Sequence, residues 1–310
     1  MFRTWSKKLT LFAFIASTVI GGNNAIAVRF SNVEIPPFFG AAFRFALAGI
    51  ILFLIVIIKK YPLPRGRVLV GVLIFGALQF GISYALIYWS LLEVPAGLFQ
   101  VILALVPLFT FVFALAHRQE SFTWRILFGG FLSIVGITII FQDSISANVP
   151  LLSLVAIVIA AACIAESIVV IKSFPKIHPI STNAIAMTVG SLILFVFSIL
   201  FRENPSIPVI PATFLAVLYL IFLGSIVMFI LALFVISQWK ASVTSYQLVL
   251  MPIVTVLFSV WLTHETISFT FLIGGVIVLF GVYIGSILPS IQIRKIFFRL
   301  KGAGKLKQAE

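Results

Sequence analysis

The chain has 310 residues, of which 62% are hydrophobic and 9% are charged, and its mean hydropathy is +1.25. Soluble domains are typically about 45–50% apolar and about 25% charged, because their surfaces must face water. The composition therefore excludes a soluble globular protein and predicts an all-α polytopic membrane protein in contact with a lipid bilayer. The single cysteine, Cys163, excludes an intrachain disulfide.

The first apolar segment, residues 9–28, has two interpretations. It follows Lys7 and Lys8 and ends near Ala25 and Ala27, as a secretory signal peptide with an A-x-A cleavage site does. It is also long enough to be a membrane-spanning helix. The two interpretations differ in whether this helix remains in the mature protein.

Nine further apolar segments of spanning length follow, so the sequence predicts ten transmembrane helices. Only short polar breaks separate them, which leaves no loop long enough for a folded soluble domain. Residues 291–310 form a basic tail. The predicted spans are residues 9–28, 37–58, 68–91, 94–117, 122–141, 150–172, 182–201, 209–237, 241–263 and 268–290.

The net charge of +13 follows a topological pattern. If the N-terminus lies inside, most basic residues fall in loops on one side of the membrane. The loops on the other side keep Arg29 and Arg202 together with most of the acidic residues. This asymmetry predicts a multi-pass protein of the cell (inner) membrane with both termini in the cytoplasm. Because the basic residues lie in short loops and a tail that meet anionic headgroups, we expect no nucleic-acid partner.

An internal repeat divides the chain. Residues 94–140 align without gaps on residues 239–285, at a constant offset of 145. A unit of five helices reverses the second copy across the membrane, so the sequence predicts two inverted five-helix repeats, residues 1–145 and 146–290. Cleavage of the first segment would leave the first copy one helix short, so we expect that helix to be retained. The aligned pairs include Pro107 with Pro252, Glu120 with Glu265, and Gly136 with Gly281.

Several stretches of sequence also point to one family. They are GGNNAIAVR in the first span, FRFALAG in the second, and AGLFQVILALVPLFTFVFALAHRQESFTWRILFGGFLSIVGI across the fourth and fifth. These stretches resemble the EamA family of the drug/metabolite transporter superfamily. The resemblance implies ten helices in two inverted halves, cytoplasmic termini, and export of amino acids or related metabolites. Where that family often has an aromatic-Gly pair, this chain has Gly21 and Gly22.

Polar residues within the predicted spans are candidates for binding a small-molecule substrate. Arg44 lies roughly 10 Å inside the second span, at about 1.5 Å per residue, with Asn23 and Asn24 at similar depth in the first. Together they could hold a carboxylate, with the guanidinium as a charged fork. Snorkelling of Arg44 to the interface is the alternative. Other candidates are Gln79, Tyr84, Gln100, Tyr246 and Gln247, although each such residue taken alone more often forms an interhelical hydrogen bond.

Glu166 is a candidate for proton coupling. It is the one acidic residue deep within a predicted span, and desolvation of a carboxyl favours its neutral form. It could therefore take up and release a proton as access alternates. The alternative is a structural role, through an ion pair with Lys172 or a hydrogen bond to a neighbour.

Other residues have predicted structural or mechanical roles. Pro107 and Pro252 lie within predicted helices, where each acts as a hinge or as a static kink. We expect Glu120 and Glu265 each to stabilise the N-terminus of the helix that follows it. The GxxxG at Gly281 to Gly285 is suited to close packing within the chain or between the protomers of a homodimer.

No nucleotide-binding motif, HExxH or GxSxG occurs in the chain. We therefore expect no direct use of ATP, no enzyme activity, no cofactor and no metal. The sequence predicts a secondary active transporter that exports small metabolites by alternating access, with or without proton coupling. The first alternative is a membrane scaffold or lipid-handling protein, and the second is an intramembrane enzyme.

Overall fold

Every regular element described in the structure, a computed structural model, is a helix. The described residues are 7–90, 92–94, 99, 102–140, 142, 149–175, 178–263 and 269–287. Long, predominantly apolar runs form these helices, because only internally hydrogen-bonded backbone is stable in lipid. Three of the helices, α2, α9 and α10, begin at a proline, whose missing N–H costs nothing in a first turn.

The helices of the first half are α1 (Lys7–Ser31), α2 (Pro37–Lys59), α3 (Arg67–Gly76), η1 (Ala77–Ile82), α4 (Ser83–Ser90), α6 (Val106–Ala116) and α7 (Trp124–Ile140). Those of the second half are α8 (Leu151–Lys172), α9 (Pro179–Leu200), α10 (Pro211–Ile221), η3 (Phe222–Val227), α11 (Met228–Gln238), α12 (Ala241–Thr244), α13 (Gln247–Thr263), α14 (Phe269–Val282) and η4 (Tyr283–Ile287).

Six helical segments among the described residues are long and apolar enough to cross a membrane. Four shorter apolar helices lie over residues 106–116, 124–140, 241–255 and 272–285. These segments overlap the predicted spans, so the all-helical membrane fold is confirmed. The count of ten crossings stays a prediction.

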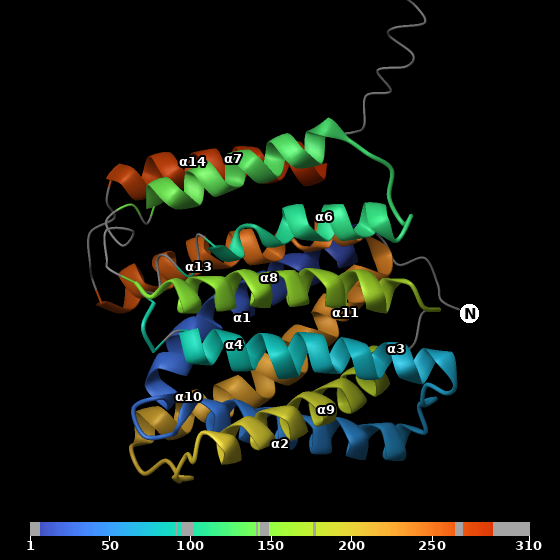
Figure 1. Cartoon of the computed structure of the whole chain (residues 1–310), viewed down its shortest axis with the longest axis vertical. Coiled ribbons are helices and arrows are strands. Elements are labelled where there is room, and N and C mark those ends of the chain that lie inside the picture. The colour runs from blue at the N-terminus through green and yellow to red at the C-terminus, as the bar shows by residue number, and fades with distance from the viewer. Residues whose placement is uncertain are drawn as a thin grey trace, which may run out of the picture.

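The two halves pack together with internal symmetry (Figure 1). At one edge of the bundle α7 packs on α14, and at the opposite edge α2 packs on α9. Within each of these pairs, the two helices occupy corresponding places in the two halves. Between the edges, the contact of α1 with α13 is matched by that of α6 with α8. Such paired contacts are those expected of two related units joined about a two-fold axis.

Two π-helical segments extend the repeat beyond the aligned sequence. Segment η1 covers Ala77–Ile82, and η3 covers Phe222–Val227. The two ranges differ by 145 residues, the same offset as the sequence repeat. The residue types in the two segments differ, so the sequence alignment alone did not include them. A π-bulge interrupts regular helical hydrogen bonding and often marks a functional region.

Glycines bring α7 and α14 into direct backbone contact. A Cβ atom on Gly129 would lie 2.6 Å from the carbonyl oxygen of Gly281, and one on Gly136 would lie 2.7 Å from that of Gly274. The pairing runs antiparallel, and each contact is the symmetry mate of the other. Gly281 and Gly285 therefore serve packing within the chain, one of the two uses expected of the GxxxG sequence.

This interface predicts different effects for two neighbouring substitutions. A Cβ on Gly274 would lie 2.6 Å from the carbonyl oxygen of Gly136, whereas nothing lies within 4 Å of one on Gly275. We expect Gly274→Ala to force α7 and α14 apart and to lower the free energy of unfolding by about 1–3 kcal/mol. Gly275→Ala is the control and should unfold at the wild-type temperature in detergent. Equal melting temperatures for the two variants would contradict this packing.

Carboxylates bind helix N-termini at both ends of the bundle. Glu203 accepts hydrogen bonds from the backbone N–H groups of Phe38 (3.0 Å) and Phe39 (2.7 Å), at the start of α2. We call the end of the bundle that holds Glu203 the Glu203 end, and we call the opposite end, which holds Lys172, the Lys172 end. At the Lys172 end, Glu120 accepts hydrogen bonds from the Ser242 backbone N–H (3.1 Å) and hydroxyl (2.6 Å).

The position of Glu120 corrects an expectation. It stabilises the start of α12 in the other half of the chain, and not the start of α7, which follows it in sequence. The N-terminus of α12 offers free N–H groups that attract a carboxylate, as any helix start does. Glu265, the repeat counterpart, lies outside the described residues.

Glu34 at the Glu203 end predicts a pH dependence of stability. Desolvation raises the pKa of this carboxyl, but hydrogen bonds from Ile210, Thr213 and Val209 outweigh it and hold that pKa below its usual value. The resulting stabilisation is therefore complete above the unfolded pKa of about 4.3 and is lost as the pH falls through the folded pKa. We expect the melting temperature to fall less between pH 7 and pH 3 in Glu34→Gln than in the wild type. The same fall in both would refute this linkage.

Candidate functional site

Arg44 is buried inside the bundle, and 2% of it is exposed. Its Nη2 donates a hydrogen bond to the hydroxyl of Tyr84 at 3.4 Å. The guanidinium carbon lies 4.4 Å from the centre of the Phe45 ring and 5.2 Å from that of Tyr84. Stacking on aromatic rings favours a desolvated cation, and it orients the planar guanidinium.

Arg44 nevertheless keeps unsatisfied hydrogen-bonding capacity. Its Nε and Nη1 atoms are buried and meet no acceptor at hydrogen-bonding distance among the described residues, although the Tyr88 hydroxyl also lies near the guanidinium. The described part of the chain also places no carboxylate within ion-pair distance of the guanidinium. A buried cation without an anion is costly, so the site is suited to an anionic group from outside the described residues.

The two asparagines of α1 differ in their surroundings. Asn24 Nδ2 donates to the carbonyl oxygen of Gly224 in η3 (3.1 Å) and to the sulfur of Met228 (3.4 Å), while its buried Oδ1 has no partner in the described structure. Asn23 Nδ2 donates to the carbonyl oxygen of Val19 on its own helix, at 3.1 Å. Asn24 therefore joins α1 to the π-helical segment of the second half.

Gln79 and Gln247 line one small cavity of about 60 Å³, which we call the Gln79 cavity. Gln79 Oε1 accepts a hydrogen bond from the Ser167 hydroxyl at 2.7 Å. Gln247 Nε2 donates to the Phe14 carbonyl oxygen at 3.3 Å and to the Ser17 hydroxyl. Apolar side chains of α3, α8, α11 and α13 form most of the remaining wall.

A larger cavity of about 310 Å³ lies at the Lys172 end, and we call it the Lys172 cavity. Leu233 and Ile236 line both cavities, so the two adjoin. The ammonium of Lys172 donates to the carbonyl oxygens of Ile236 (2.8 Å) and Trp239 and thereby holds the end of α11. Cations at helix C-termini interact favourably with the helix dipole.

Three aromatic side chains lie between the Gln79 cavity and Arg44, and we call them the aromatic cluster: Phe45, Phe80 and Phe229. Phe229 lines the cavity, and its ring centre lies 4.6 Å from that of Phe80 and 6.5 Å from that of Phe45. The Phe45 ring in turn lies against Arg44. A continuous chain of ring contacts therefore connects the wall of the Gln79 cavity with the guanidinium of Arg44.

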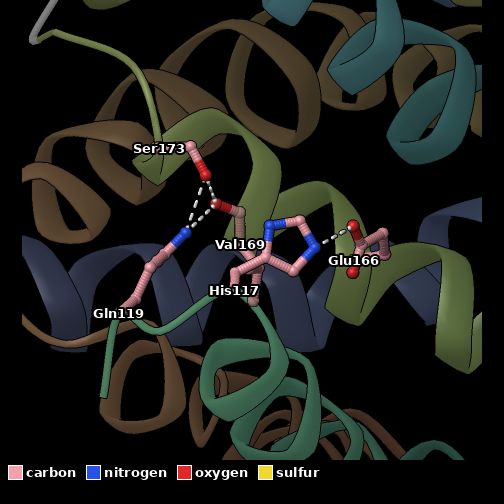
Figure 2. A network of polar contacts seen from close by, with 5 residues as sticks. All are labelled: His117, Gln119, Glu166, Val169 and Ser173. Atoms are coloured by element: carbon pink, nitrogen blue, oxygen red, sulfur yellow. Dashed lines mark hydrogen bonds and ion pairs between the residues drawn. The ribbon is translucent and has the colours of Figure 1, made fainter.

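Glu166 in α8 contacts His117, the residue that directly follows α6, and the contact is an ion pair when the imidazole is protonated (Figure 2). The Glu166 Oε1 to His117 Nε2 distance is 2.9 Å, and the two side chains are 28% and 39% exposed. A second link in Figure 2 joins Gln119 Nε2 to the Val169 carbonyl oxygen (2.8 Å) and the Ser173 hydroxyl (2.7 Å). The carboxylate is therefore partly open to solvent at the Lys172 end.

The identity of this partner corrects one interpretation of Glu166. The ion pair forms with His117, whereas Lys172 binds the backbone at the end of α11. Sequence reasoning did not single out His117. The sequence did contain a signal for it. His117 is one of three histidines in the chain, a residue type that titrates near neutral pH, and it stands at the end of an apolar span.

The remaining candidates lie elsewhere. Tyr246 is fully buried, and its hydroxyl donates to the Ile126 carbonyl oxygen at 3.2 Å, among residues of α7, α13 and α14. Gln100 lies outside the described residues. Pro252 lies inside α13, as expected, but Pro107 is the second residue of α6, just after a turn, and does not interrupt a continuous helix. The hinge role of both prolines stays a prediction.

Comparisons with known proteins agree with this architecture. The chain is 24% identical over 283 residues to the uncharacterized transporter YoaV of Bacillus subtilis (strain 168), covering 89% of this chain and 96% of that protein. It is 26% identical over 264 residues to the uncharacterized inner membrane transporter YedA of Escherichia coli (strain K12), covering 84% and 85%. A crystal structure with a TM-score of 0.77 and 15% identity covers 94% of this chain and 99% of its own, which shows a shared fold.

The family relationship covers both halves. The EamA-like transporter family matches residues 7–142 and again residues 151–287. The two matches correspond to the two halves of the chain. The chain is therefore a multi-pass membrane protein that belongs to the EamA-like transporter family.

Proposed function

We propose that the protein is a secondary active transporter that exports small metabolites carrying a carboxylate, amino acids or related compounds, by alternating access. The observation that carries the proposal is the buried guanidinium of Arg44, with two unpartnered nitrogens and no carboxylate among the described residues near it. A bidentate pair with a substrate carboxylate would satisfy both the charge and the hydrogen-bonding capacity.

The proposed orientation supports export as the direction of transport. The Lys172 end carries the basic loops, and the positive-inside rule places such loops in the cytoplasm together with both termini. In that orientation the Lys172 cavity and the adjoining Gln79 cavity lie on the cytoplasmic side of the aromatic cluster. A solute then enters from the cytoplasm, passes the rings of Phe45, Phe80 and Phe229, and meets Arg44 in the outer half of the bundle.

Proton coupling is assigned to the pair of Glu166 and His117. The charge of an imidazole side chain changes between pH 5 and 8. A carboxylate is held as an ion pair while the imidazole is protonated, and that attraction is lost when the imidazole becomes neutral. Because the pair bridges α6 and α8, one helix from each half, its state can bias how the halves rock against each other.

Counterflow in proteoliposomes tests the proposed function. Purified protein is reconstituted into proteoliposomes that are loaded with an unlabelled amino acid. A trace of labelled amino acid is then added outside, and the experiment is repeated with amino acids whose side chains increase in size. Saturable accumulation of label that needs the internal amino acid supports a transporter. Chemical conversion of the label would instead indicate an enzyme. Neither exchange nor conversion with any member of the panel would indicate a scaffold or lipid-handling protein.

A further inference from the structure

Two methionines occupy the space beside Gly21 in α1. A Cβ atom on Gly21 would lie 2.3 Å from Cε and 2.9 Å from Sδ of Met251, and 3.2 Å from Cε of Met228. The position of a side chain at residue 21 is thus filled by the flexible ends of two methionines, one from α11 and one from α13. Both methionines also line the Gln79 cavity.

The Gln79 cavity is too small for a metabolite as it stands. Its volume is about 60 Å³, whereas sites for small molecules are usually about 300–1,000 Å³. The helices themselves leave little room to widen it here, because a Cβ on Gly22 would lie 2.9 Å from the backbone oxygen of Met251 and 2.7 Å from Val254. Additional volume must therefore come from side chains.

Met228 and Met251 are the wall residues best able to supply that volume. Methionine is unbranched, has three rotatable side-chain bonds and adapts to irregular spaces. Its sulfur and terminal methyl group also contact aromatic and aliphatic groups favourably. Asn24 marks the polar border of the same space, since its Nδ2 donates to the Met228 sulfur and its buried Oδ1 has no partner in the described structure.

We propose that Met228 and Met251 form an adjustable wall beside Gly21, which admits the apolar side chain of a bound solute when the two methionines change rotamer. The inference rests on the proposed function and deepens it. The site takes amphipathic solutes with an apolar body, and the two methionines set the size that is accepted. The methionine ends can lie beside α1 because residue 21 has no side chain.

Two substitutions with opposite effects test the wall. The measurement is the ratio of tryptophan to alanine counterflow in proteoliposomes. Met251→Ala enlarges the space, so we expect the ratio to rise about tenfold or more. An effect of that size is typical of one or two methylenes in an apolar pocket. Gly21→Leu fills the same space, and the ratio should fall by a similar factor. A general loss of folded protein would lower both rates and leave their ratio unchanged.

Met187→Ala is the matched control. Met187 is fully buried in the main core and lies outside the residues that line the two cavities. The same truncation there should lower stability without changing the tryptophan to alanine ratio. If Met251→Ala changes that ratio no more than Met187→Ala, the adjustable wall is wrong while the transport function stands.

Cysteine labelling decides the inference even if no amino acid is transported. In a Cys163→Ser background, Met251→Cys should react with methanethiosulfonate reagents added from the side of the Lys172 end, and reaction should slow as the reagent becomes larger. Val249→Cys is the control, because Val249 is fully buried on the same helix among residues of α7 and α14. Equal protection of residues 251 and 249 would overturn the proposal. Absence of amino-acid exchange by the wild type would overturn only the proposed function.

Discussion

Arg44→Met should abolish high-affinity transport and at the same time raise the melting temperature of the protein. The guanidinium is enclosed by aromatic rings, and two of its nitrogens lack partners among the described residues. Replacing an unpaired buried charge with an apolar side chain of similar volume removes a desolvation cost. Losing the charged partner of a substrate carboxylate typically costs about 2–5 kcal/mol, which is a loss of affinity of about 30-fold or more.

Arg44→Lys separates charge from geometry. Lysine keeps the positive charge but loses the planar fork and its stacking on Phe45. We expect a strong rise in the apparent KM for counterflow, with the protein still folded. Arg65→Lys, at an exposed position of the same half, is the control and should behave as the wild type. Wild-type KM in Arg44→Lys, or a lower melting temperature in Arg44→Met, would assign Arg44 a structural role.

Glu166→Gln should keep exchange of solute in the absence of a gradient but lose its acceleration by an imposed pH difference. The amide resembles the protonated carboxyl permanently, so it cannot alternate between a pair with His117 and a neutral state. For one proton per solute, each pH unit is worth about 1.4 kcal/mol and drives accumulation about tenfold. The measurement is accumulation in proteoliposomes with and without a one-unit pH difference.

His117→Gln and Gln119→Leu identify what the pair contributes. His117→Gln removes the titratable partner of Glu166. It should weaken the acceleration of transport by a pH difference, as Glu166→Gln does. Gln119→Leu removes the neighbouring link between α6 and α8 without removing a titratable group, so it should leave that response intact. If Glu166→Gln keeps the full response to pH, the pair is structural. If it loses all exchange while still folded, Glu166 belongs to the substrate site.

Much of the fold was predictable because the bilayer restricts it. Backbone in lipid must satisfy its own hydrogen bonds, so long apolar runs read directly as helices. The repeat was visible in Pro107, Gly136 and their counterparts. Gly136 and Gly281 stand at close backbone contacts where no larger residue fits, whereas Pro107 lies in the first turn of α6 and Pro252 lies inside α13. The π-helical segments Ala77–Ile82 and Phe222–Val227 follow the same offset, but they share little sequence, so no sequence match revealed them.

The sequence by itself determined which polar residues are costly in a membrane, and so it identified Arg44, Asn24 and Glu166 as candidates. Only the tertiary structure decided their partners. Glu166 meets His117 and not Lys172, and Glu120 meets the start of α12 and not the helix after it. These choices depend on how each helix is rotated and where it crosses its neighbours, and close packing across the whole bundle sets that geometry. Hydropathy specifies that a helix crosses the membrane, but it does not specify which face of that helix meets which neighbour.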